Sequence, residues 1–190
     1  MILASGSPRR LDIMRDHGYD PIIHPAEVEE NIPEYKRIEE VPMYLALKKG
    51  LAVLEETDLK EGLIISADTI VYLGDPVGQG TIMGKPRNKE EGFSMLSRLR
   101  NSFHYVITGV SIIDISSGIK RVSSDTTKVF FTDFTDEELD AYLDTDEAYD
   151  KAGGYAIQGT FHKYVKEFDG SYDNVIGFPW DLIEKELVKI

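Results

Sequence analysis

The sequence predicts one α/β domain built on a mixed β-sheet. Apolar, strand-like runs alternate with helical patterns in the first half of the chain, which is typical of helices packed on a sheet. Two long strand-like runs, residues 104–115 and 119–134, then follow each other across a Ser-Ser-Gly turn and predict a hairpin. With 190 residues, 42% of them hydrophobic, the chain can bury one sizeable core.

The N-terminal stretch, residues 2–11, runs a short apolar strand through a Ser/Gly turn into a helix. Ser7 suits the N-cap and Pro8 the first helical position. Arg9 and Arg10 then lie in the first turn, where the helix dipole disfavours cations unless an anion is bound there. Either these arginines bind an anion such as phosphate, or both are solvated on a surface turn.

Two charged features follow. Residues 25–31 are rich in glutamate, and either form a solvated loop or direct one carboxylate toward a cation near the arginines. A helix is predicted over residues 41–56, and Lys49 lies in the middle of it among apolar neighbours three and four positions away. The Lys49 ammonium therefore either reaches solvent from the edge of that face or meets a partner.

The strongest strand signal, residues 62–73, contains an aspartate that the strand itself does not explain. Asp68 lies among aliphatic side chains, so its carboxylate must be paired, protonated or bound to a metal. Residues 74–80 are predicted to be a loop, and residues 81–85 a short extended piece. Asp68 is therefore the residue that most strongly suggests a functional site.

The second half of the chain is assigned from local pattern. Residues 150–159 are rich in glycine, which lets a backbone approach a ligand closely, but they match neither a Walker loop nor a dinucleotide-binding fingerprint. The remaining predictions are a helix capped by Asn88, a short helix with a capping box at Thr135 and Glu138, a strand over residues 161–168, a loop over 174–179 and a closing helix over 180–190.

Composition excludes several classes of function. The formal net charge of −13 argues against binding to a nucleic acid polymer. The chain has no cysteine, so a metal would need oxygen or histidine ligands. No apolar run approaches the length of a membrane span, and the N-terminal apolar piece is too short for a signal peptide. We therefore expect a cytoplasmic protein with no membrane partner.

Eight short segments occur in this order along the chain: LASGSPRR from Leu3, Glu29-Glu30, Lys48-Lys49, Ala67-Asp68-Thr69, Gly84-Lys85-Pro86, Asp150-Lys151-Ala152-Gly153, Ile157-Gln158-Gly159 and Gly170-Ser171-Tyr172. Taken together and in this order, they resemble the Maf family of nucleoside triphosphate pyrophosphatases. The resemblance spans nearly the whole chain and implies one domain over residues 1–190. It implies an elongated mixed sheet flanked by helices, Maf/ITPase-like, with an active-site cleft between two lobes, often in a homodimer.

The resemblance implies hydrolysis of a nucleoside triphosphate to the monophosphate and pyrophosphate with a divalent cation, Mg²⁺ or Mn²⁺. Glu30 and Asp68 are the expected metal ligands, and Asp68 is the expected base for the attacking water. The expected partners of the triphosphate and the departing pyrophosphate are Arg10, Lys49 and Lys85, with Ser5 as a further hydroxyl donor.

Arg9, Thr69 and Gln158 match the branch of the family associated with dTTP and UTP, and modified pyrimidine nucleotides are further candidate substrates. A carboxamide can both accept and donate along the edge of uracil or thymine, which suits Gln158 to reading the base. Alternatively, Gln158 only holds its loop. The rival function is a nucleotide-sensing regulatory protein, linked to arrest of cell division, with little turnover.

Overall fold

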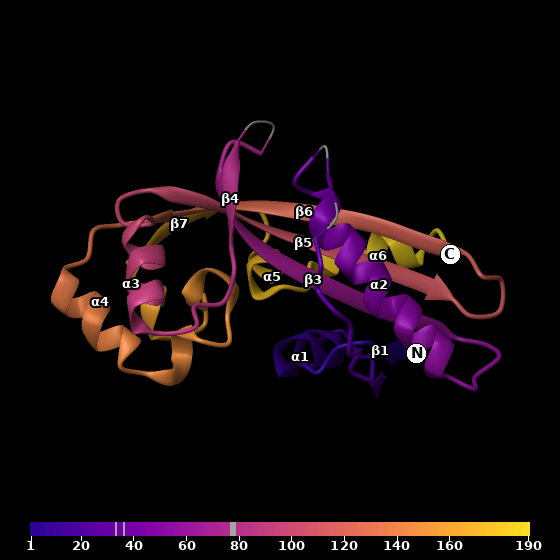
Figure 1. The fold of residues 1–190 in the computed structure, drawn as a ribbon. Helices are drawn as coiled ribbons and strands as arrows, with labels where there is room; N and C mark the ends of the chain where they lie inside the picture. Colours follow the sequence, from indigo (N-terminus) through magenta and orange to yellow (C-terminus); the bar gives the residue numbers. More distant parts are fainter. Residues whose placement is uncertain (33, 36, 77–78) are drawn as a thin grey trace. The chain divides into compact units, whose positions relative to one another are not determined.

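The computed structural model describes residues 1–190 except 33, 36, 77 and 78. Two residues of the loop predicted over 74–80 therefore lie outside the described residues. The elements, labelled in Figure 1, are β1 (Ile2–Leu3), α1 (Pro8–Asp16), β2 (Ile22–Ile23), α2 (Glu40–Glu56), β3 (Leu63–Gly74), β4 (Gly80–Met83), α3 (Lys89–Ser97), β5 (Phe103–Asp114), β6 (Lys120–Phe131), α4 (Asp136–Leu143), three short 3₁₀ turns (Asp146–Ala148, Ala152–Gly154 and Thr160–Tyr164), β7 (Val165–Asp169), α5 (Tyr172–Ile176) and α6 (Trp180–Leu187).

The described strands form one seven-stranded sheet in the order β2-β1-β3-β5-β6-β7, with β4 paired to β3. Strand β1 runs parallel to both β2 and β3, whereas β4 is antiparallel to β3 and β7 is antiparallel to β6. The sheet is thus mixed and flanked by helices, which confirms the predicted fold class. No helix in the described part of the chain is long and apolar enough to cross a membrane.

The chain divides into two compact units. Unit 1 comprises residues 1–69, 108–125 and 177–190, and unit 2 comprises residues 70–107 and 126–176. Each unit has its own apolar core. The core of unit 1 includes Ile2, Ala4, Val53, Ile64 and Ile113, all buried.

Helix α2 lies close against the sheet in unit 1 because two glycines leave room for it. A Cβ on Gly50 would lie 2.9 Å from the hydroxyl oxygen of Ser66 on β3. A Cβ on Gly109 of β5 would lie only 2.2 Å from the backbone of Pro42. The Ser66 hydroxyl donates to the Ala46 carbonyl of α2 at 2.7 Å, which fixes the helix on the strand that carries Asp68.

The core of unit 2 is rich in aromatic side chains, and it explains why one predicted strand begins later than expected. A strand was expected over residues 161–168, but the structure has a 3₁₀ turn at Thr160–Tyr164 before β7 begins at Val165. The turn brings Phe161 and Tyr164 to the same side, where their rings lie 4.8 Å apart in the core. Burial of these rings outweighs the strand propensity of the local sequence.

Another prediction is wrong, because part of the loop expected over residues 174–179 is helix α5. The Ser171 hydroxyl oxygen accepts the Asn174 N–H at 3.2 Å near the start of this helix. The buried Asn174 amide nitrogen donates to the Val106 carbonyl and to the Thr127 hydroxyl. These contacts come from strands that are distant in the sequence, so the local pattern does not reveal the helix.

Candidate active site

The turn between β1 and α1 is built around Ser5. Ser7 occupies the N-cap position of α1, but its side chain makes no capping hydrogen bond. Instead, the Ser5 hydroxyl oxygen accepts the Ser7 N–H at 3.2 Å. The same oxygen accepts a hydrogen bond from Nη1 of Arg10 at 3.1 Å. Ser7 thus occupies the predicted N-cap position, but the turn is organised by the hydroxyl of the buried Ser5 rather than by that of Ser7.

Lys49 of α2 lies between two carboxylates, which explains why a lysine occurs on an apolar helix face. Its Nζ donates to Oδ1 of Asp68 at 2.5 Å and to Oε1 of Glu30 at 2.7 Å. The side chains of Lys49 and Asp68 are 15% and 10% exposed, whereas that of Glu30 is 57% exposed. Of the two alternatives for Lys49, the structure shows the one in which its ammonium meets a partner, and Glu30 of the acidic segment faces this cation.

The environment of Asp68 shifts its proton affinity in two opposing directions. Burial raises its pKa above the ordinary value of 3.8, because a carboxylate loses hydration inside the protein. The neighbouring Lys49 ammonium opposes this shift by charge and by hydrogen bonding. The net direction is upward, so Asp68 is a stronger base than an exposed aspartate.

Arg10 of α1 donates hydrogen bonds to four acceptors of the protein. Its Nη1 donates to the Ala67 carbonyl at 2.7 Å as well as to Ser5, and its Nη2 donates to the Thr69 hydroxyl at 3.3 Å. Its Nε donates to the Gly177 carbonyl at 2.9 Å. Burial lowers the pKa of Arg10 to about 10, which leaves the guanidinium charged at neutral pH. Arg9, its neighbour on α1, is partly buried.

Two members of this network were not identified from the sequence. The hydroxyl of Thr108 on β5 lies 3.0 Å from that of Thr69. Gly177 has φ +102°, and a Cβ there would lie 2.8 Å from the Thr69 hydroxyl oxygen. Both the positive φ of Gly177 and its close approach to Thr69 therefore favour glycine at this position. Thr108 gives no local signal within its strand, whereas Gly177 stands out only as a glycine in an expected loop.

The other two predicted site residues belong to unit 2, where neighbouring segments support them. Lys85 is exposed and follows β4. The carbonyl of the preceding Gly84 accepts the Gly153 N–H at 3.0 Å, which joins this segment to the glycine-rich stretch. Gln158 is exposed in a turn closed by the Gly159 N–H, which donates to the Ala156 carbonyl at 3.0 Å.

The Gln158 turn is held by a neighbouring carboxylate. Oε2 of Glu147 accepts the Thr160 N–H at 2.9 Å and the Thr160 hydroxyl at 3.1 Å. A Cβ on Gly159 would lie 2.5 Å from the same oxygen, so the turn passes close to Glu147. The backbone around Gln158 is therefore fixed while its side chain faces solvent.

Glu30 and Asp68 are chemically suited to a divalent cation. No group of three or more His, Cys, Asp or Glu side chains with metal-binding geometry occurs among residues 1–190 with the four exceptions named above. Two carboxylates match the way Mg²⁺ usually binds in phosphate chemistry, with one or two protein carboxylates, waters and substrate oxygens rather than a complete protein cage. The donor set therefore fits an ion that is bound together with its substrate.

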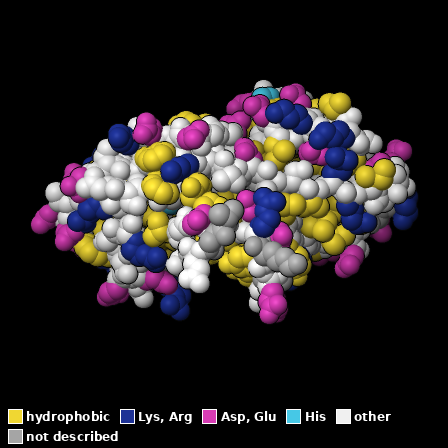
Figure 2. Space-filling view, turned by 90° about the horizontal axis from the view of Figure 1, so that it is seen from above, with side chains coloured by type: hydrophobic (Ala, Val, Ile, Leu, Met, Phe, Trp, Pro, Cys, Tyr) yellow, Lys and Arg dark blue, Asp and Glu magenta, His cyan; other side chains and the backbone are white. Residues whose placement is uncertain are grey.

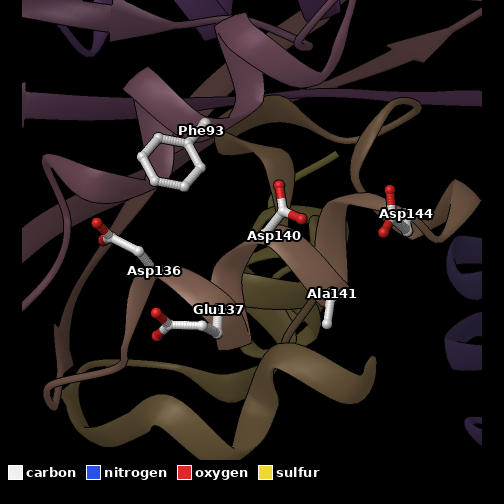
Figure 3. A pocket seen from close by; sticks show the side chains of 6 residues that line it. All are labelled: Phe93, Asp136, Glu137, Asp140, Ala141 and Asp144. Carbon is white, nitrogen blue, oxygen red and sulfur yellow. The ribbon is translucent and has the colours of Figure 1, made fainter.

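Unit 2 has an acidic cluster of its own, which lies between α3 and α4. A cavity of about 410 Å³ is lined by Phe93, Asp136, Glu137, Asp140, Ala141 and Asp144 (Figure 3). Lys89 donates to Asp144 at 2.5 Å and contacts Asp140 at 2.9 Å, and Arg100 contacts Asp136 at 2.5 Å. On the molecular face shown in Figure 2, basic and acidic side chains are likewise interspersed.

Comparison with known proteins agrees with these features. The family model described as "Maf-like protein" matches residues 1–190. A protein of Desulforamulus reducens named dTTP/UTP pyrophosphatase is 40% identical over 94% of this chain and 90% of its own length. Proteins of the same name from Caldicellulosiruptor bescii and Caldicellulosiruptor saccharolyticus are 39% and 40% identical, and the matches cover 94% and 100% of this chain and 88% and 94% of theirs. The chain therefore belongs to the Maf family.

Proposed function

We propose that this protein is a nucleoside triphosphate pyrophosphatase that converts dTTP and UTP to their monophosphates and pyrophosphate. The observation that carries the proposal is the buried Asp68 carboxylate, which is hydrogen-bonded to Lys49. Arg10 links the strand that carries Asp68 to the turn between β1 and α1. The names of the relatives support the same substrates. Modified pyrimidine nucleotides that keep the same base edge are further candidates.

In this proposal Asp68 accepts a proton from the water that attacks phosphorus. A base must be ionised yet retain affinity for a proton, and burial gives Asp68 a higher pKa than an exposed aspartate has. Lys49 keeps the carboxylate oriented through its hydrogen bond. The pyrophosphate then departs with the electrons of the broken P–O bond.

Glu30 and Asp68 would hold a divalent cation, Mg²⁺ or Mn²⁺. When bound, such an ion neutralises phosphate oxygens and stabilises the charge that develops during phosphoryl transfer. Lys49 lies between the same two carboxylates and adds a fixed positive charge. We assign Lys85 a second charge, directed at the phosphate chain. Arg10 adds a third positive charge near Asp68, since it donates to the residues directly before and after it. Ser5 adds a hydroxyl at the turn, where helix N–H groups also favour an anion.

Arg9, Thr69 and Gln158 are assigned to substrate selection. Gln158 projects from a turn whose backbone is fixed on both sides, which suits a side chain that reads a hydrogen-bonding edge. Its carboxamide can donate to a carbonyl and accept the N3–H of uracil or thymine. We further propose that the protein acts in the cytoplasm as a homodimer, with no nucleic acid polymer as partner.

The experiment is an assay of pyrophosphate release from UTP with Mg²⁺, with Mn²⁺ and with a chelator. We expect release with either cation and loss of release with the chelator. Binding of UTP without release under any condition would instead support the nucleotide-sensing alternative. Release that survives exhaustive chelation would remove Glu30 and Asp68 from metal binding without removing the hydrolase activity.

A further inference from the structure

Arg10 and Lys49 reach β3 from opposite faces. Side chains alternate along a strand, so Ser66 and Asp68 share one face and Thr69 lies on the other. Contacts agree with this alternation, since Ser66 and Asp68 both bond to α2. Arg10 of α1 bonds instead to the Thr69 hydroxyl and the Ala67 carbonyl. The Arg10 guanidinium thus contacts β3 on the face opposite to the Asp68 carboxylate.

The residues that Arg10 holds are those directly before and after Asp68. The same guanidinium also bonds to Ser5 in the β1–α1 turn and to the Gly177 carbonyl before α6. It thereby joins three separate segments of unit 1 at one point. A guanidinium presents its N–H groups in a rigid fork, so several acceptors are fixed relative to one another at small cost in side-chain entropy.

Gly177 packs closely against one side of this fork. Gly177 approaches Thr69 so closely that a Cβ would lie 2.8 Å from its hydroxyl oxygen and 3.6 Å from Nη2 of Arg10. Thr69 in turn contacts Thr108 of the next strand. Four of the five N–H groups of Arg10 therefore donate to acceptors of the protein, so these groups need no bound phosphate to be satisfied.

We infer that Arg10 is a positioning residue that holds the Asp68 strand in place, and that it does not bind the phosphate chain directly. This inference rests on the proposed function in one respect, because it takes Asp68 to be the base. It replaces the expectation, drawn from the family resemblance, that Arg10 contacts the triphosphate. Lys85 then differs from Arg10, because Lys85 is the residue assigned to touch phosphate.

The test compares Arg10→Lys, Lys85→Ala and Arg121→Lys in the full-length protein. Arg10→Lys keeps the charge but replaces the fork with a single ammonium. Arg121→Lys is the matched control, since Arg121 also lies in unit 1 and bonds through Nε to the buried Glu186 at 2.5 Å. The readouts are kcat and KM for UTP, pyrophosphate affinity by calorimetry, and hydrogen exchange of the amides of residues 66–70.

For Arg10→Lys we expect kcat to fall about 10²-fold, the effect of displacing a reacting group by about 1 Å. Pyrophosphate affinity and KM should stay within about threefold of the original, and exchange over residues 66–70 should accelerate by at least about tenfold. Lys85→Ala should weaken pyrophosphate binding, and Arg121→Lys should leave exchange over residues 66–70 unchanged. Unchanged exchange there in Arg10→Lys, or a loss of pyrophosphate affinity matching that of Lys85→Ala, would overturn the inference.

If Arg10→Lys fails to fold, Gly177→Ala disturbs the same network from its other side while keeping every charge. It should show the same acceleration of exchange at residues 66–70 and the same fall in kcat without loss of pyrophosphate affinity. If the unmodified protein shows no turnover at all, the proposed function fails. Hydrogen exchange over residues 66–70 still decides whether Arg10 holds β3 in place. Failure of the proposed function and failure of the Arg10 inference are therefore distinguishable.

Discussion

Two lysines in this protein make nearly the same contacts and have very different surroundings. Lys49 lies 2.5 Å from Asp68 and 2.7 Å from Glu30, and Lys89 lies 2.5 Å from Asp144 and 2.9 Å from Asp140. The side chain of Asp68 is 10% exposed, whereas those of Asp140 and Asp144 are 57% and 66% exposed. The comparison therefore separates the effect of burial from the effect of charge pairing.

Burial changes what the two clusters can do. In the exposed cluster, hydrogen bonding to Asp140 and Asp144 raises the pKa of Lys89, as expected for a pair in water. In the buried cluster, loss of hydration raises the pKa of Asp68 despite the adjacent ammonium. The two clusters thus differ in proton affinity although both concentrate carboxylates around a lysine. A carboxylate with altered proton affinity beside a fixed cation is an indicator of an active site.

The largest expected effect comes from Asp68→Asn, which keeps the shape of the side chain but cannot accept a proton or bind a cation as a carboxylate does. We expect pyrophosphate release to fall by about 10²–10⁴, the usual contribution of a positioned base, with the fold retained. The matched control is Asp140→Asn in the exposed cluster, which should retain normal turnover. Near-normal turnover by Asp68→Asn, with folding verified by circular dichroism, would remove Asp68 from the base role.

Lys85→Ala should have the next largest effect, because it removes a charge assigned to the departing pyrophosphate. By analogy with the loss of one donor from an oxyanion hole, the rate should fall by roughly 10²–10³. Lys89→Ala, in the same unit, provides the comparison for loss of a lysine. A fall below about threefold, far under that range, would indicate that another residue stabilises the phosphate chain.

Gln158→Glu tests the selection of the nucleobase of the substrate rather than the overall rate of hydrolysis. A carboxylate would place an acceptor against a pyrimidine carbonyl, at a cost of about 1–3 kcal/mol for the unpaired contact. Turnover of UTP and dTTP should fall more than that of GTP, measured with all three nucleotides. The control is Gln79→Glu, the same change at an exposed loop position. Equal losses for every nucleotide would mean that Gln158 only holds its loop.

The shifted pKa of Asp68 also predicts how stability depends on pH. Because the folded-state pKa is raised, the folded protein holds this proton more tightly than the unfolded chain. Ionisation of Asp68 therefore destabilises the fold as pH rises from 3.8 through the folded-state pKa. Thermal unfolding should show that Asp68→Asn gains more stability, relative to the original protein, at about pH 7 than at about pH 4. The reverse order would contradict the assigned direction of the shift.

The smallest effect is expected for Lys89→Met in the exposed cluster. An ion pair in water contributes little to stability, so neither pyrophosphate release nor the melting temperature should change detectably. Both can be measured alongside Lys49→Met, which removes the equivalent contact in the buried cluster and should reduce turnover strongly. Comparable losses from the two substitutions would show that burial does not distinguish the clusters.

Local sequence pattern predicted much of what positions the site. The strand and helix at the N-terminus, helix α2 and strand β3 follow from apolar periodicity and from turn residues. The two side chains that did not fit their local surroundings, Lys49 and Asp68, prove to be partners of each other. A charged group on an apolar surface must be satisfied somewhere, so the mismatch itself identifies the residue.

What local pattern did not predict depends on contacts between distant segments. The 3₁₀ turn at Thr160–Tyr164 is set by aromatic packing and by Glu147, and α5 is supported by Asn174 bonding to two strands. The acceptors of Arg10 likewise come from three separate segments. The helix-dipole argument left two alternatives for Arg10, a bound anion or solvation, and the structure shows instead that its N–H groups donate to acceptors of the protein.

The most direct test of the central claim is to incubate UTP with the protein and a divalent cation in ¹⁸O-labelled water and to identify the products by mass spectrometry. Attack by water with pyrophosphate as the leaving group predicts UMP and pyrophosphate in equal amounts, with one labelled oxygen in UMP. The same incubation with Asp68→Asn should yield almost none of either. Recovery of intact UTP, or formation of UDP and inorganic phosphate, would contradict a pyrophosphatase in which the buried carboxylate activates water.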